Sequence, residues 1–190
     1  MWETDEFGAA HEGRPGVLIA DGSEPKAVYF DAGSGGHMHQ SRDWWVYDGT
    51  LGAPLATHVR ASCACGWRSE THYPLDWETV GRHSPEEYDT SGLEGDWDQH
   101  IAEVEARAVP VPEDLAALLA QVDRRLDALA SDAPLAALRA IATLERIVTE
   151  AGRTAALYAE ADDTVGSTLG PGLGLPERDA RARLLQYTLR

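Results

Sequence analysis

Two cysteines, Cys63 and Cys65, are separated by one residue and are the only cysteines in the chain. On a β-strand, side chains at positions i and i+2 point to the same face, so both sulfur atoms can reach one ion. Thiolates favour soft or borderline metals, and Zn²⁺ is the most common of these in structural sites. Two more ligands are needed, and the neighbouring histidines that offer them are His58, His72, His83 and His100. We therefore predict a structural zinc site, with free buried thiols or a redox-active pair as the alternatives.

The segment from His58 to His100 resembles a pattern found in many small actinobacterial proteins, Cys-x-Cys-Gly-Trp followed later by Trp-x-x-His. The second part is present here as Trp97-Asp98-Gln99-His100. The resemblance implies that Cys63, Cys65 and His100 are ligands. For the fourth ligand we expect His72, with His58 as the alternative.

The remaining histidines carry weaker signals. His11 and His83 are isolated in the sequence, and we interpret them as surface residues. His37 and His39 form a His-x-His pair beside several glycines, and we interpret this pair as part of a solvated loop.

The segments that must position these ligands divide the chain into three. Residues 1–26 contain Gly, Pro and acidic residues without a clear period, which predicts a loop that is in part disordered. Residues 27–109 hold five of the six tryptophans and short strand-like runs, which predicts a small antiparallel β unit that includes the zinc site. The strand-like runs are residues 27–30, 44–47, 57–65 and 67–73, and a helix is expected from Trp97 to about residue 106.

Residues 110–190 have a helical pattern. Leucines and valines from Leu115 to Leu129 follow the 3-4-7 spacing of one helix face, and a second such stripe begins at Leu135 after a break at residues 131–134. Two helices of this kind can bury their stripes against each other. The predicted fold class is α+β, with a metal-stapled β unit followed by a helical bundle.

The C-terminal segment, residues 169–184, resembles the helix-turn-helix tail of many bacterial regulators. The resemblance implies that Arg178, Arg181 and Arg183 lie near double-stranded DNA. Pro171 falls inside the helix expected to precede the turn, and proline costs a helix about 3 kcal/mol. The alternative is therefore a degenerate motif that binds protein.

Charge and composition narrow the function classes. The net charge of −16 disfavours nonspecific binding to nucleic acid or to an anionic membrane. No apolar run reaches the length of a membrane span, and the acidic N-terminus does not have the pattern of a secretory signal. We find no phosphate-binding loop, zinc-protease motif or nucleophile elbow, so we do not expect an enzyme. The sequence predicts a cytoplasmic, zinc-stabilised bacterial regulatory protein that binds DNA or the transcription machinery. The alternative is a protein-interaction adaptor that does not bind DNA.

Overall fold

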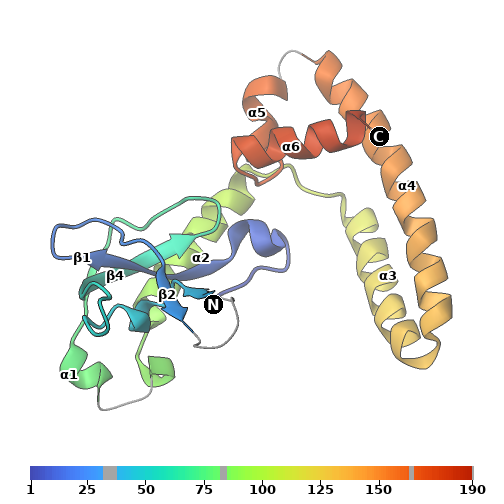
Figure 1. Ribbon diagram of the computed structural model, residues 1–190. Coiled ribbons are helices and arrows are strands. Elements are labelled where there is room, and N and C mark those ends of the chain that lie inside the picture. The colour runs from blue at the N-terminus through green and yellow to red at the C-terminus, as the bar shows by residue number, and fades with distance from the viewer. Residues whose placement is uncertain (32–37, 82–84, 163–164, 190) are drawn as a thin grey trace. The chain divides into compact units, whose positions relative to one another are not determined.

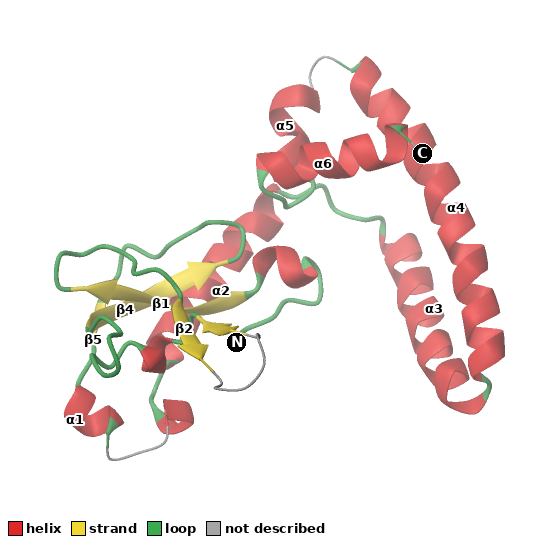
Figure 2. Cartoon of the chain, viewed as in Figure 1, coloured by secondary structure: helices red, strands yellow, loops and turns green. Residues whose placement is uncertain are grey.

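The chain forms two compact units, Met1–Glu105 and Ala106–Arg190. The structure is a computed structural model that describes residues 1–31, 38–81, 85–162 and 165–189. All of the described strands lie in the first unit, and the second unit contains helices only (Figure 2). The predicted α+β class is therefore confirmed, while the helix-turn-helix character of the tail stays a prediction. Among the helices described, none is long and apolar enough to span a membrane.

The main sheet of the first unit has three antiparallel strands in the order β1-β4-β5. These strands are β1 (Gly13–Ile19), β4 (Ala56–Cys63) and β5 (Tyr73–Pro74). A separate two-stranded sheet consists of β2 (Val28–Asp31) and β3 (Met38–Ser41). Val59, Ala61 and Cys63 alternate along β4 and are buried in the core, as a strand with one covered face requires.

Strand β1 corrects the prediction that residues 1–26 form a loop. It pairs with β4 from Gly13 opposite Cys63 to Ile19 opposite Ala56. The strand was not predicted because the sequence Gly-Arg-Pro-Gly at its start has the composition of a turn. Pro15 is compatible with this position because β1 is an edge strand, where a missing N–H breaks no ladder.

Helix α2 (Ser91–Arg107) covers the core face of this sheet (Figure 1). Its buried residues, Leu93, Trp97, His100 and Ile101, lie on one helical face because their spacings are three or four residues. The helix begins six residues before the expected start, since Gly92 and Gly95 weaken the helical pattern there. Shorter helical segments are η1 (Gly8–His11), η2 (Trp44–Val46), α1 (Trp77–Val80) and η3 (Pro85–Glu87).

Two tryptophan rings pack against the backbone at Gly13, where a side chain would otherwise project. The rings of Trp2 and Trp97 have centroids 6.0 Å apart, and a Cβ atom at Gly13 would lie 2.6 Å from Trp97 Nε1 and 2.7 Å from Trp2 Cε3. Trp2 also pairs with Gly13 through two backbone hydrogen bonds of 2.8 and 2.9 Å. Glycine is therefore required at this position, and the segment between Trp2 and Gly13 is a closed loop held at both ends.

The helices that the structure describes between residues 113 and 188 are α3 (Glu113–Asp132), α4 (Pro134–Ala161), α5 (Val165–Gly172) and α6 (Glu177–Thr188). Helices α3 and α4 form an antiparallel hairpin that turns at Ala133 (Figure 1). The break between them lies within the predicted one, and Pro134 occupies the first turn of α4, where proline is tolerated. Helix α6 packs against α4 and α5.

Candidate metal centre

Two thiols and two imidazoles converge inside the first unit. His11, Cys63, Cys65 and His100 each offer one ligand atom, and the four atoms all lie within 4.8 Å of one another. Cys63 Sγ is 3.5 Å from His11 Nδ1, and Cys65 Sγ is 3.3 Å from His100 Nε2. His11 is 3% exposed, His100 is 8% exposed and Cys63 is buried, whereas Cys65 is half-buried.

The two cysteines are brought together by a tight turn rather than by a strand. Strand β4 ends at Cys63, and the chain reverses through Gly66, whose N–H donates to the Cys63 carbonyl at 3.0 Å. Gly66 has a φ of 101°, in the left-handed region that glycine adopts without strain. The backbone N–H of Trp67 then donates to Cys65 Sγ at 3.4 Å, which favours the thiolate form of Cys65. The strand expected over residues 57–65 therefore ends two residues too late.

His11 reaches the cluster from the loop that Trp2 and Gly13 close. The indole of Trp97 donates to the His11 carbonyl at 3.1 Å, and this hydrogen bond is buried. The backbone carbonyl of the next residue, Glu12, accepts a 2.9 Å hydrogen bond from the backbone N–H of Ala64, which lies between the two cysteines. The His11 backbone is thus tied both to α2 and to the cysteine turn, which fixes where its imidazole lies.

His100 is oriented by stacking. Its imidazole lies against the indole of Trp67 with a centroid distance of 4.3 Å and an interplanar angle of 5°. Trp67 directly follows the cysteine turn, and its backbone N–H donates to Cys65 Sγ. Trp67 therefore contacts both the turn that carries Cys65 and the imidazole of His100 on α2. The tryptophan of the Cys-x-Cys-Gly-Trp segment therefore has a clear physical role.

The distances fit a four-coordinate metal ion. With metal–sulfur bonds of about 2.3 Å and metal–nitrogen bonds of about 2.0–2.1 Å, tetrahedral angles place sulfur and nitrogen about 3.6 Å apart. Two of the sulfur–nitrogen distances in the cluster are 3.3 and 3.5 Å, and all four ligand atoms lie within 4.8 Å of one another. The donor set and its geometry are those of a possible buried His₂Cys₂ metal-binding group.

The pKa values of the two thiols in the cluster are shifted in opposite directions. A hydrogen bond from the Cys65 thiol lowers the pKa of Cys63 well below its usual range, and the imidazole of His100 and the charge of His11 act in the same direction. The same hydrogen bond raises the pKa of Cys65, which is its donor. Since metals bind the thiolate, Cys63 is ready to bind, whereas Cys65 must lose a proton as an ion enters.

Three of the four expected ligands are together in the structure. Cys63, Cys65 and His100 lie in the cluster, but His72 and the alternative His58 do not. Both of these side chains are exposed and lie near each other, with ring centroids 6.5 Å apart.

The fourth donor is His11, which the sequence analysis interpreted as a surface residue. It is 52 residues before Cys63, outside any recognisable motif, and only the fold of residues 2–13 brings it to the site. His37 and His83 lie outside the described residues, and the side chain of His39 is likewise not described.

The three arginines expected near DNA lie on α6 and are exposed. Arg178 pairs with Asp179 at 3.2 Å, and Arg181 pairs with Glu177 at 2.7 Å. Both carboxylates belong to the first turn of the same helix.

Comparison with known proteins adds no relative: no family model, no curated protein and no solved structure matches the chain. The interpretation of the cluster therefore rests on its own geometry.

We expect His11→Ala to weaken zinc binding far more than His72→Ala, the matched control at the ligand position that the sequence suggests. Loss of an outer-shell partner alone usually costs about 10–100-fold in metal affinity, so loss of a direct ligand should cost at least that much. Competition with a chromophoric chelator measures both affinities. The assignment of His11 is wrong if His11→Ala keeps the parental affinity, or if His72→Ala loses as much.

Proposed function

We propose that this protein is a zinc-stapled, non-enzymatic interaction protein. The observation that carries the first part is the closed donor set of His11, Cys63, Cys65 and His100. Structural zinc sites have four protein ligands, whereas catalytic sites keep one position for water or substrate. A closed, buried set therefore supports a structural role for the ion.

Zinc is the ion that best fits this donor set. Two thiolates and two imidazoles suit Zn²⁺, while the hard cations Mg²⁺ and Ca²⁺ prefer oxygen ligands. In its described residues the first unit has two small sheets around one core, and small units of this kind commonly gain stability from a bound metal. In the cytoplasm, where thiols stay reduced, both cysteines would remain available to the ion.

The second part of the proposal rests on the α3–α4 hairpin. Helix α3 has no buried residue along its 20 residues. Its apolar side chains follow one broad stripe, and those exposed to solvent are Leu115, Leu118, Leu119 and Val122. The facing helix also exposes large apolar residues, among them Leu138, Ile141, Ile147 and Val148. Contiguous apolar surface of this kind marks an interaction site.

The width of the stripe supports a helical partner. Apolar residues at positions 115, 118, 119, 122, 126 and 129 cover an arc of about 100°, which suits a helix with more than one neighbour. Among the described elements, the main neighbour of α3 is α4. A groove between the two helices remains open, lined by Leu118, Val122 and Leu126 of α3 and Leu144 of α4. We propose that a second copy of the hairpin fills it and completes a four-helix bundle.

We expect the full-length protein to be a dimer and the double variant Leu118→Glu/Leu119→Glu to be a monomer. Burying an exposed leucine is worth about 1.5–3 kcal/mol, and a glutamate at the same place would have to be desolvated. Light scattering coupled to size-exclusion chromatography measures the mass directly.

The matched control for this test is Ala117→Glu/Ala120→Glu, which adds the same charge on the opposite face of α3 and should leave the dimer intact. A parental protein that is monomeric at tens of micromolar would contradict self-association through the hairpin. Equal dissociation of both double variants would show that added charge, rather than the apolar stripe, controls assembly.

DNA binding by the tail is a second candidate, favoured by the order of its elements. Helix α5 is followed by the short connection 173–176 and then by α6, which exposes Arg178, Arg181 and Arg183. Arginines on such a helix can contact phosphates or guanine edges. To do so, Arg178 and Arg181 would have to exchange their carboxylate partners for DNA, which lowers the expected gain.

If the tail binds DNA, the triple variant Arg178→Gln/Arg181→Gln/Arg183→Gln should bind duplex DNA more weakly in gel-shift measurements. A plot of log affinity against log salt concentration should also become less steep. Its slope should change by about one for each DNA phosphate that an arginine no longer neutralises. The control is Arg139→Gln/Arg146→Gln/Arg153→Gln, which removes the same charge from α4. If the parental protein retards no duplex even at low salt, DNA binding is excluded as its function.

A further inference from the structure

A second polar site lies on the face of the sheet opposite the core. Arg14 on β1 pairs directly with Ser62 on β4, and an isolated bridge pairs Ser62 with Arg68 on its other side. Residues opposite each other in antiparallel strands share a face. The Ser62 hydroxyl is therefore flanked by two guanidinium groups in a row across the sheet.

This row borders a pocket, and Gly16 makes room for the Ser62 hydroxyl at its edge. A Cβ atom at Gly16 would overlap Ser62 Oγ, so any other residue at position 16 would displace the hydroxyl. Arg14, Ser62 and Arg68 line the pocket together with Arg42 and Glu24. The cavity is small, about 30 Å³, and its mouth is open to solvent.

The pocket contains polar groups that the protein leaves unsatisfied. Ser62 is 3% exposed, yet its Oγ has no hydrogen-bond partner within the described parts of the chain. The other buried side-chain atom described without a partner is Arg60 Nε, two residues earlier on the same strand. Buried polar groups are nearly always hydrogen-bonded, so this hydroxyl requires a partner from outside the chain.

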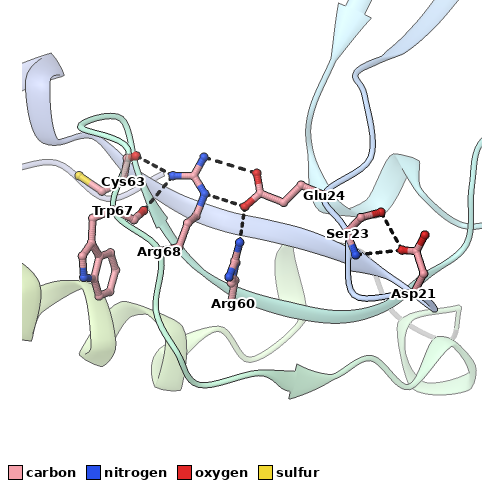
Figure 3. A network of polar contacts seen from close by, with 7 residues as sticks. All are labelled: Asp21, Ser23, Glu24, Arg60, Cys63, Trp67 and Arg68. Carbon is pink, nitrogen blue, oxygen red and sulfur yellow. Dashed lines mark hydrogen bonds and ion pairs between the residues drawn. The ribbon is translucent and has the colours of Figure 1, made fainter. Parts of the chain in front are cut away.

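The charge of the pocket is positive although the whole chain has a net charge of −16. A single carboxylate, Glu24, accepts hydrogen bonds from Arg60 at 2.6 Å and from Arg68 at 2.7 Å (Figure 3). In the described ranges, neither Arg14 nor Arg42 forms an ion pair with a carboxylate. Two guanidinium groups thus remain at the pocket after Glu24 has neutralised part of the charge.

From this arrangement we propose that the pocket binds a phosphate group, either free or as a phosphomonoester. Arginine presents paired N–H donors that match phosphate oxygens, and the Ser62 hydroxyl supplies a further donor between them. A tetrahedral dianion has oxygens facing several directions at once, which suits donors on β1, on β4 and at Arg42. A planar carboxylate has only two oxygens and would leave part of this set unpaired.

Arg68 is unsuitable for testing the site because it also holds the cysteine turn. Its Nη1 donates to the carbonyls of Cys63 at 3.1 Å and Trp67 at 2.8 Å (Figure 3). Arg42 is exposed and can be changed without disturbing the core. Ser62→Ala removes the orphan hydroxyl alone.

The test is calorimetric titration of the full-length protein with inorganic phosphate and, separately, with methyl phosphate, in chloride of matched ionic strength. We expect saturable binding of one equivalent of at least one of them. Arg42→Gln should weaken it by about tenfold, since the variant cannot form a charge-assisted hydrogen bond there. Arg139→Gln on α4, which removes the same charge, should have no effect.

Ser62→Ala distinguishes a ligand-binding hydroxyl from a packing defect. If the hydroxyl binds the ligand, the variant should bind phosphate several-fold more weakly while its unliganded form melts at a higher temperature. Absence of saturable binding by both phosphates would overturn the proposal. So would unchanged binding in both Arg42→Gln and Ser62→Ala, or an equally weakened affinity in Arg139→Gln.

Discussion

Four polar donors are buried at one point of the N-terminal unit, and the segments around them are arranged to keep them there. Without an ion, the thiols and imidazoles have one another as partners, and a thiol forms only weak hydrogen bonds. One four-coordinate ion would satisfy all of them and would join η1, the end of β4 and α2. These three segments are far apart in the sequence, so such an ion would restrict the unfolded chain as well as stabilise the folded one.

Arg68 links the metal centre to the arginine-rich pocket. Its Nη1 donates hydrogen bonds to two backbone carbonyls of the cysteine turn, and its Nε donates a hydrogen bond to the Glu24 carboxylate (Figure 3). An anion that drew Arg68 toward the pocket would change the hydrogen bonds that shape the turn. The two sites are therefore neighbours that share a residue, although each is inferred from separate observations.

The sequence predicted those parts of the site that are local in the chain. Cys63 and Cys65 lie next to each other, and His100 is marked by the Trp-x-x-His pattern. His11 was missed because its position depends on a tertiary arrangement, namely the loop closed by Trp2 and the edge strand that follows it. That strand was missed in turn because glycine and Pro15 at its start have the composition of a loop. Helices α3 and α4, whose apolar periodicity is strong, were predicted closely.

X-ray absorption at the zinc edge, on protein loaded with one equivalent of zinc, tests the central claim most directly. The account predicts two sulfur neighbours at about 2.3 Å and two nitrogen neighbours at about 2.0–2.1 Å, with no water in the first coordination sphere. A spectrum with fewer than two sulfurs, or with a bound water in place of an imidazole, would contradict the closed His₂Cys₂ site.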